Sequence, residues 1–378
     1  MLSSPLACAL THLRLLTKST LDINATNEQR EGAVHEAASM GHMDVVWKLI
    51  SAGAELGARG SDAVSGLVFA AVQHDTTDLL ALLQKRGILD VEAKSHGRVP
   101  LVEAVRQGHT TSVEWLIKAG ANVSATTHSG ETALAVAAFE DRFPILWRLH
   151  EGGASIFATN EYGGTALMSA AHFGHELEAK RLISLGLDVN AANHRGDTAL
   201  TLACSRDDLP LVETLIKLGA TAEQRGSRRD TPLIRAARFR RVDTTRYLLE
   251  RKAVEVDAAN KRGDTALIEA CRSGSVDVAK LLVEHGASVA HANRAGNTPL
   301  LDAAESGNPE LVKWLLEQPG IDVHAKNRHG DGAIELSQWG RESETVGGLL
   351  KAKGVVAVLH DYDNREHHDG EHDANQNH

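Results

Sequence analysis

The chain has 378 residues and a formal net charge of −10, and 42% of its residues are hydrophobic but only 4% are aromatic. This length exceeds the usual single compact core, so the chain forms either several domains or one array that grows by repetition. The charge disfavours indiscriminate binding to nucleic acid or acidic membranes. Without a long apolar stretch, a convincing signal peptide or cysteines at metal or disulfide spacing, we expect a cytoplasmic or nuclear protein with no membrane partner.

Residues 1–26 are the first predicted element in chain order. They contain Ser4-Pro5-Leu6 and end in Leu21-Asp22-Ile23-Asn24-Ala25, which resembles a shortened copy of the unit that repeats downstream. We expect this segment to be an N-terminal capping repeat, because the end of a stacked array needs a polar outer face.

Residues 27–354 are predicted to form one repeat array. Apolar residues at helical spacing follow each copy of a Thr-(Ala/Pro)-Leu step, and a second apolar run completes each unit, so each unit is predicted to be two short helices and a turn. The threonine is expected to cap the first helix. Successive spacings of 33, 33, 33, 34 and 33 residues separate the steps at Thr132, Thr165, Thr198, Thr231, Thr265 and Thr298.

The third unit shows the full repeat pattern, with Val99-Pro100-Leu101, Gly108-His109 and Gly120-Ala121-Asn122-Val123 in order. This pattern resembles the ankyrin family, in which a Thr-Pro-Leu-His step, Gly-His and Gly-Ala-Asp/Asn-Val recur about every 33 residues. The resemblance covers about ten units. It implies an all-α ankyrin-repeat solenoid of helix-turn-helix repeats with short hairpin tips.

The C-terminal end of the chain changes character. The tenth unit has Gly332 in place of the threonine and carries polar residues such as Gln338, so we expect it to cap the array. Residues 355–378 form a His/Asp-rich tail that we expect to be disordered, because it offers almost no apolar surface to bury. A weak metal-chelating role for the tail is an open alternative.

No pattern typical of catalysis stands out, so we expect neither an enzyme nor a cofactor or metal site. Cys204 and Cys271 occupy the second position of an Ala-Ala pair, where a small apolar group packs in the core. Four histidines lie where the ankyrin pattern itself places histidine and are expected to bond to nearby backbone, namely His35, His42, His109 and His175. The glycines are accounted for by turns, and no phosphate-binding loop or nucleophile motif is present.

The resemblance implies that a partner meets the concave face, formed by the hairpin tips and the exposed side of the first helices. Residues 226–252 hold nine Lys/Arg against three Asp/Glu, which points to an acidic partner, although solvated repeat surface is the plain alternative. Exposed aromatic side chains there can anchor a partner. The candidate partner-binding residues are Phe139, Tyr162, Phe173, Arg195, Arg206, Arg228, Arg229, Arg238, Phe239, Lys261, Arg262, Arg272 and Arg294.

We therefore interpret the chain as a monomeric, non-catalytic adaptor or scaffold that binds an acidic protein segment. Two alternatives stay open: a nucleic-acid or phosphate-bearing ligand on the same basic residues, and a substrate-recruiting subunit of a modifying complex. A basic strip is expected from four arginines on the inner surface, and reversing two of them, Arg238 and Arg272, is expected to leave folding unaffected. These four are Arg206, Arg238, Arg262 and Arg272.

The seventh unit departs from the repeat at its turns. Arg229 replaces the turn glycine, and Arg240 replaces the glycine that ends the first helix, where His74, Asp141 and Asp207 stand in other units. If the backbone at Arg240 is left-handed, the missing glycine costs about 1 kcal/mol.

Overall fold

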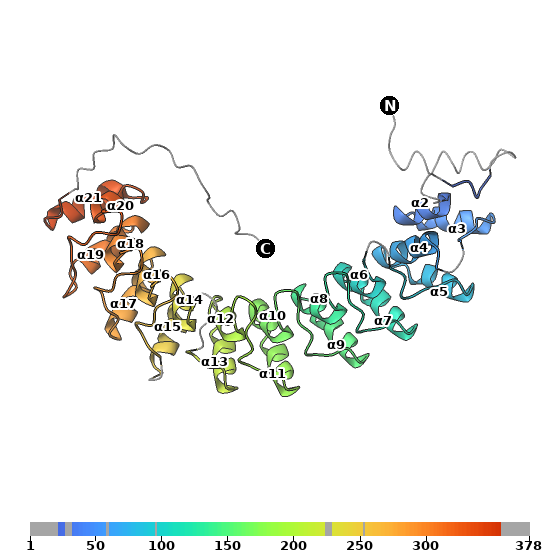
Figure 1. Cartoon of the computed structure of the whole chain (residues 1–378), viewed down its shortest axis with the longest axis horizontal. Helices are drawn as coiled ribbons and strands as arrows, with labels where there is room; N and C mark the ends of the chain where they lie inside the picture. The colour runs from blue at the N-terminus through green and yellow to red at the C-terminus, as the bar shows by residue number, and fades with distance from the viewer. Residues whose placement is uncertain are drawn as a thin grey trace, which may run out of the picture. The chain divides into compact units, whose positions relative to one another are not determined.

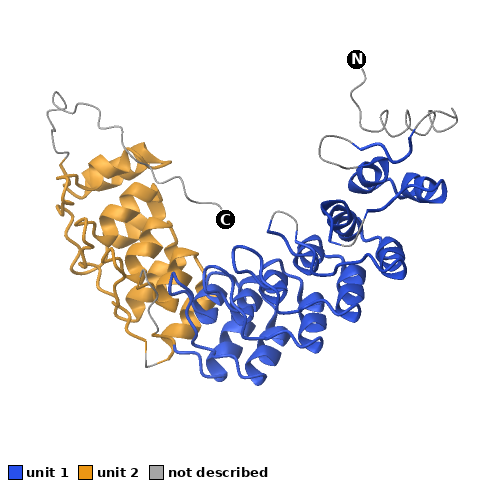
Figure 2. Cartoon of the chain, turned by 45° about the vertical axis from the view of Figure 1, so that its right-hand side comes forward, with its two compact units in different colours: residues 1–221 blue, residues 222–378 orange. Residues whose placement is uncertain are grey.

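A computed structural model describes residues 22–26, 32–57, 60–94, 97–223, 229–251 and 254–356 (Figure 1). In these ranges the chain forms twenty α-helices in ten consecutive pairs and no strand. The predicted all-α array of about ten helix-turn-helix repeats is confirmed. The chain separates into two compact units, residues 1–221 and 222–378 (Figure 2).

Unit 1 contains six helix pairs in the residues that the structure describes. The first helices are α2 (Ala33–Ser39), α4 (Asp62–Gln73), α6 (Pro100–Gln107), α8 (Ala133–Phe139), α10 (Ala166–Phe173) and α12 (Ala199–Ala203). The second helices are α3 (Met43–Ser51), α5 (Thr77–Lys85), α7 (Thr110–Lys118), α9 (Phe143–Glu151), α11 (Glu176–Ser184) and α13 (Leu209–Lys217).

Unit 2 contains the other four pairs of the described chain. Its first helices are α14 (Pro232–Arg238), α16 (Ala266–Arg272), α18 (Pro299–Ser306) and α20 (Ala333–Ser337). Its second helices are α15 (Val242–Leu249), α17 (Val276–Glu284), α19 (Pro309–Leu315) and α21 (Ser343–Ala352).

The predicted threonine caps are confirmed. In all six repeats with the threonine step, the threonine hydroxyl accepts a hydrogen bond from the backbone N–H three residues later, as Thr265 does from Ile268. This satisfies one of the N–H groups that a helix N-terminus leaves unpaired. Pro100, Pro232 and Pro299 lie in the first turn, where the missing donor costs nothing.

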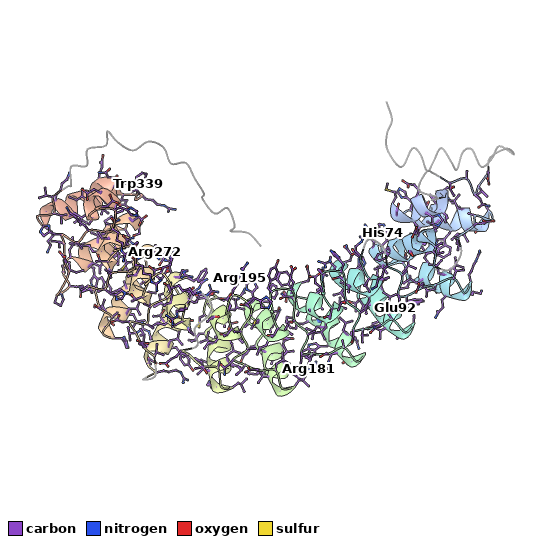
Figure 3. The ribbon with its side chains drawn as sticks, in the orientation of Figure 1. His74, Glu92, Arg181, Arg195, Arg272 and Trp339 are labelled. Carbon is purple, nitrogen blue, oxygen red and sulfur yellow. The ribbon has the colours of Figure 1, made fainter. Side chains whose placement is uncertain are left out.

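Adjacent helices of the same kind pack against each other within each unit. Neighbouring first helices, such as α14, α16 and α18, pack more closely than neighbouring second helices. Leucine and alanine fill the layer between helices, and Leu134, Leu146 and Leu149 are fully buried. We call the surface formed by the first helices and the hairpin tips the inner face of a unit. Figure 3 shows Arg195 on this side of unit 1 and Arg181 on the opposite, second-helix side.

Two residues of the seventh repeat that replace glycines have left-handed backbone, so the condition set for Arg240 is met. Arg229 and Arg240 have φ values of 57° and 62°. The expectation for the equivalent position in two other repeats is wrong. Asp75 rather than His74 is left-handed, with φ 51°, and Asp207 has no positive φ because α12 ends early and a longer turn follows it.

The second repeat begins its first helix earlier than the Ser65-Gly66-Leu67 step suggests. Ser61 is the N-cap of α4, and its hydroxyl accepts from the backbone N–H of Val64. At the N-terminal end, Asn24 accepts a hydrogen bond from the backbone N–H of Glu55 at 2.8 Å. Residues 1–21 and 357–378 of the two predicted end segments lie outside the described residues.

Candidate functional site

An asparagine side chain builds each of three successive hairpin tips on the inner face of unit 2, around residues 260, 293 and 327. Its Oδ1 atom accepts hydrogen bonds from the backbone N–H groups two and four residues later; from Asn260 these run to Arg262 and Asp264, at 2.8 and 3.0 Å. The side chain thereby fixes the turn and the position of the residue that follows the asparagine. The same bonds recur in the next two tips around Asn293 and Asn327.

Backbone hydrogen bonds join neighbouring tips in unit 2. The N–H of Arg294 donates to the carbonyl of Arg262 at 2.9 Å, and the N–H of Arg328 donates to the carbonyl of Ala295 at 2.8 Å. Gly263, with φ 79°, permits this approach, because a Cβ there would lie 2.8 Å from the backbone nitrogen of Arg294. The spacing of the tips is therefore set by the backbone.

Arg238, at the end of α14, joins two repeats behind the tips. Its guanidinium contacts both carboxylate oxygens of Asp230, at 2.8 and 3.1 Å, and lies 2.9 Å from Glu269 on α16. Only 7% and 3% of these two carboxylate side chains are exposed. Burial opposes the charge on Arg238, but hydrogen bonds with Glu269 and Asp230 outweigh it and raise the pKa of this arginine. Arg238 is a permanently charged clamp between repeats.

Arg272 makes the same kind of clamp one repeat further on. Its NH2 group lies 3.0 Å from Asp264 and 3.1 Å from Asp302 on α18, and both carboxylate side chains are fully buried. The exposed Arg262 adds a second contact to Asp264, at 2.8 Å. Three carboxylates therefore surround Arg272, because Glu269 also lies 3.0 Å from it.

The two buried aspartates respond differently to this environment. Burial alone would raise the pKa of Asp264, but its hydrogen bond with Arg272 outweighs burial and lowers the pKa to about 2. Burial raises the pKa of Asp302 to about 7, against the opposing effect of Arg272 and with a further contribution from Glu305. The pKa of Asp302 thus lies near neutral pH.

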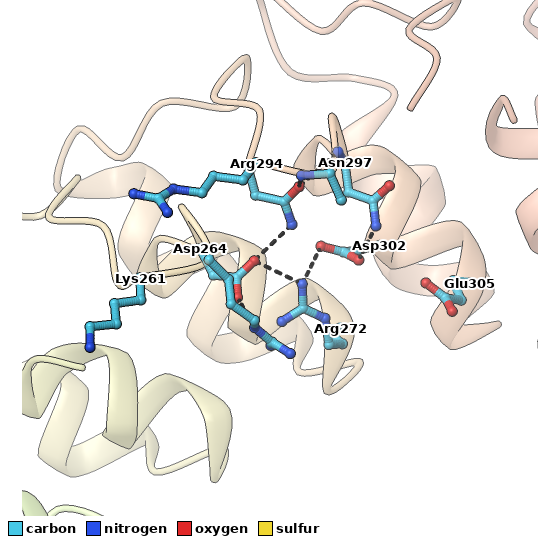
Figure 4. Close-up of a pocket in the computed structure, with 10 residues that line it drawn as sticks. Lys261, Asp264, Arg272, Arg294, Asn297, Asp302 and Glu305 are labelled. Carbon is cyan, nitrogen blue, oxygen red and sulfur yellow. Dashed lines mark hydrogen bonds and ion pairs between the residues drawn. The ribbon is translucent and has the colours of Figure 1, made fainter. Parts of the chain in front are cut away.

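A cavity of about 560 Å³ lies in front of these groups on the inner face of unit 2. Figure 4 shows Lys261 and Arg294 at one side of the cavity, Glu305 at the other, and Arg272 between them. Lys261 and Arg294 are exposed, and no side-chain hydrogen bond or ion pair joins either to the described part of the chain. The unpaired cations therefore lie at the rim, and the carboxylates of the network lie buried behind them.

The inner face of unit 1 has an aromatic character. Phe139 and Tyr162 are about half exposed, at 54% and 50%. Phe173 packs edge-on against His172, with ring centroids 5.0 Å apart. Burial, and then the charge of Arg206, lower the pKa of His172. These side chains offer apolar contact area rather than a charged surface.

Two of the predicted cations lie on this face of unit 1. Arg206 donates to the backbone carbonyl of His172 at 2.7 Å. The guanidinium of Arg195 lies 6.0 Å from the ring centroid of Tyr162, within cation–π range.

Comparison with known proteins decides the family. A family model described as ankyrin repeats (3 copies) matches residues 34–127, 113–193, 134–225, 177–260 and 252–327. The chain belongs to the ankyrin-repeat family. Ankyrin repeats generally mediate protein–protein interaction, and ankyrin-repeat proteins are typically non-catalytic.

The chain is also similar to a curated fungal ankyrin protein. It is 29% identical over 127 residues to the ankyrin repeat domain-containing protein SAT10 of Stachybotrys chartarum (strain CBS 109288 / IBT 7711). The alignment covers 33% of this chain and 6% of that relative, so the chain spans a small part of the relative's length. The likeness supports the repeat and identifies no partner.

The predicted arginines of this ankyrin array fall into two groups in unit 2. Arg238, Arg262 and Arg272 all approach the Oε1 atom of Glu269, at 2.9, 3.4 and 3.0 Å. The second group is Arg294 at its tip, which, like the neighbouring Lys261, makes no ion pair with the described residues. The expectation that charge reversal at the clamp arginines leaves folding unaffected has to be replaced, because glutamates there would face buried carboxylates.

The other predicted residues of unit 2 lie near α14. Phe239 is 42% exposed, and its ring centroid lies 6.0 Å from the guanidinium of Arg235. Arg229 is exposed at its left-handed turn. Arg228 lies outside the described residues.

The buried acids of the network were not predicted from the sequence. The sequence signal for them is a spacing: Arg238 follows Asp230 by eight residues and precedes Glu269 by 31. Arg272 likewise follows Asp264 by eight residues and precedes Asp302 by 30. One clamp is therefore predicted wherever three residues occur together. These are an acid directly before the threonine cap, an arginine seven residues after that cap, and an acid in the first helix of the next repeat.

The histidine and cysteine expectations are partly confirmed. His35 accepts from the backbone N–H of Gly32 and His109 contacts the backbone carbonyl of Val72, whereas His175 pairs with the side chain of Asp141. Cys204 and Cys271 are fully buried, as expected for core residues.

Two absences hold for the described ranges. No group of three or more His, Cys, Asp or Glu side chains there could hold a metal ion, and no helix there is long and apolar enough to cross a lipid bilayer. The histidines of the tail lie outside those ranges.

Proposed function

We propose that this ankyrin array is a non-catalytic interaction module that binds an acidic segment of a protein partner on the inner face of unit 2. The observation that carries the proposal is that negative groups are buried and positive groups are exposed on this face. The carboxylates of the clamp network are buried and neutralised by arginines, whereas three cations at successive tips are exposed and make no ion pair with the described residues. We call these three the tip cations; they are Lys261, Arg294 and Arg328.

An approaching partner therefore meets positive charge first. The clamp arginines have little charge left to offer, because each contacts two or more carboxylates. The tip cations have no such partner in the described chain, so a carboxylate that binds them displaces only water. Charge complementarity of this kind contributes to the rate and specificity of association more than to affinity.

The aromatic residues of unit 1 are proposed as a separate anchoring surface. Phe139, Tyr162 and Phe173 offer apolar area, and large aromatic side chains are enriched among residues that dominate binding energy. Truncating Phe139 and Tyr162 together to alanine should lower the affinity for a partner that uses this face. The same change should leave the affinity of unit 2 for an acidic peptide unaffected.

A protein segment fits the charge of the chain better than a nucleic acid does. The net charge of −10 repels a dense polyanion, whereas a peptide with a few carboxylates can engage the tips alone. Nucleic-acid binding through the same cations is the competing function, and its salt dependence separates the two.

The proposal is tested by fluorescence anisotropy with three labelled probes of equal length. These are an acidic peptide, the same peptide with glutamine for every glutamate, and oligo(dT). We expect the acidic peptide to bind and the glutamine peptide not to bind. Equal binding of both peptides, or tighter binding of oligo(dT) with a steep loss of affinity as salt rises, would contradict the proposal.

A further inference from the structure

The tip cations form a row with a regular step, and this step restricts what can bind. Lys261, Arg294 and Arg328 each directly follow the asparagine that builds their tip, at intervals of 33 and 34 residues. Their backbones are fixed by that asparagine and by the hydrogen bonds between tips. The row is thus a property of the backbone and not of flexible side chains alone.

The step of the row follows from helix packing. Neighbouring packed helices lie about 8–10 Å apart. Backbone hydrogen bonds join each of these tips to the next, so we take the helix spacing as the step of the row. Three successive cations therefore span about two such steps. A ligand that engages all three must carry its negative groups at this interval and on one side.

Polyproline II is the peptide conformation that meets both conditions over a short length. It rises about 3.1 Å per residue with about three residues per turn. Every third side chain therefore lies on the same side, about 9 Å from the previous side chain on that side. In a β-strand, side chains on one side are only about 6.6 Å apart. An α-helix needs about seven residues for each step of roughly 10 Å.

We infer that unit 2 recognises an acidic segment in the polyproline II conformation, with carboxylates at every third residue. This deepens and rests on the proposed function, because it names the conformation and the spacing of the acidic partner. Like charges along the segment repel one another and favour extended chain over helix, which reduces the entropy lost on binding.

The neighbouring acids also favour a spaced rather than a continuous run of carboxylates. Glu305 is exposed at the opposite side of the cavity from Lys261 and Arg294, and it carries the same sign as the ligand. A carboxylate directed toward Glu305 would be repelled. Residues between the carboxylates of the ligand are therefore expected to be neutral.

The test compares labelled peptides that have three glutamates each, and the first two of them have identical composition. In one the glutamates lie at positions 1, 4 and 7, with alanine and proline between them; in the second they lie at positions 1, 3 and 5. A third, helix-forming peptide of equal charge carries them at positions 1, 8 and 15. Binding to the full chain is measured by fluorescence anisotropy at constant ionic strength, because exposed charges are screened by salt.

We expect the first peptide to bind about two- to fivefold more tightly than the second, since the second loses one of three pairs and each exposed pair contributes a factor of about two to five. Changing the three tip cations to glutamine should abolish this preference. The matched control changes three exposed cations on second helices of unit 2, Arg246, Lys313 and Lys351, to glutamine, and should leave the preference unchanged.

Three results would overturn the inference in distinguishable ways. Equal binding of the first two peptides, weakened equally by the tip variant, would refute the spacing and leave the proposed function standing. Tighter binding of the helical peptide would refute polyproline II. Binding of none of the peptides would contradict the proposed function itself.

Discussion

One position of the repeat differs between three consecutive repeats of unit 1 and the first two repeats of unit 2. In unit 1 the position seven residues after the helix cap is filled by Phe139, His172 and Ser205 in consecutive repeats. In unit 2 the first two repeats place Arg238 and Arg272 there. The backbone is the same helix pair in both units, so the difference lies in what fills the inner face and not in the fold.

The burial of charge differs between the units in the same way. Arg106 of unit 1 occupies this position and pairs with Glu131 at 3.1 Å, with 42% and 22% of the two side chains exposed. Arg272 of unit 2 pairs with two carboxylates that are fully buried. A paired arginine at one repeat position can therefore be a surface feature or part of the interior, depending on the acids that its neighbours supply.

The largest effect on stability is expected when the paired arginine of each unit, Arg272 or Arg106, is changed to glutamine. Arg272→Gln leaves buried carboxylates without their counter-charge and should lower the free energy of unfolding by about 3 kcal/mol. Arg106→Gln should lower it by less than about 1 kcal/mol, because an exposed pair contributes little. Urea unfolding followed by circular dichroism measures both. Equal losses would remove the distinction between the units.

The pH dependence of stability should show the second-largest effect, through Asp302. Its pKa of about 7 lies above the usual value of 3.8, so the folded chain holds this proton where the unfolded chain has lost it. The stability that this group contributes is present at low pH and falls as pH rises, by about 2 kcal/mol between pH 5 and 7.

Asp264 acts in the opposite direction and at lower pH. Its lowered pKa, about 2, contributes stability above its usual value of 3.8 that is lost only as the medium becomes more acidic. It therefore does not mask Asp302 between pH 5 and 7. Unfolding of the full chain and of Asp302→Asn is compared over this range, and a variant with the same slope as the full chain would exclude Asp302 as the source.

The helix caps should respond alike in both units. Thr165 of unit 1 and Thr265 of unit 2 accept the same backbone hydrogen bond, at 3.2 and 3.4 Å. Changing either to alanine should cost about 1 kcal/mol. Serine at the same positions, which keeps the acceptor, is the control. A cost confined to one unit would show that the units differ in more than their inner faces.

The smallest effect is expected at the left-handed position that ends the first helix. Arg240→Gly should stabilise unit 2 by about 0.5 kcal/mol, because relief of the left-handed strain exceeds the entropy that glycine adds to the unfolded chain. Asp141→Gly in unit 1 should gain less, since aspartate tolerates this conformation better and contacts His175. Thermal unfolding of the two variants ranks them.

The fold was predicted well from the sequence because the same local signals recur in most repeats. The threonine caps and the first-turn prolines are local signals, and each appears with the expected hydrogen bond or position. The one-residue error at His74 arose because helix length decides which residue turns left-handed, and α4 is longer than its neighbours. The local sequence pattern therefore predicts that a helix forms, whereas the residue at which the helix ends depends on packing.

The candidate site was harder to predict because charges were counted without their partners. The excess of arginine around residues 226–252 is real, yet the acids that neutralise Arg238 and Arg272 lie partly in the following repeats. Ion pairing between repeats depends on residues about 30 positions apart in the sequence. Lys261 and Arg294, which have no ion-pair partner among the described residues, could be distinguished from the clamps only once those pairs were known.

The central claim, that an acidic segment binds the tip cations of unit 2, is tested most directly by one affinity comparison. The peptide with glutamates at positions 1, 4 and 7 is titrated into the full chain, into Lys261→Gln/Arg294→Gln, and into Arg195→Gln/Arg206→Gln of unit 1. We predict that the unit 2 variant weakens binding about tenfold and that the unit 1 variant leaves Kd unchanged. Unchanged affinity in the unit 2 variant, or a loss found only in the unit 1 variant, would contradict the claim.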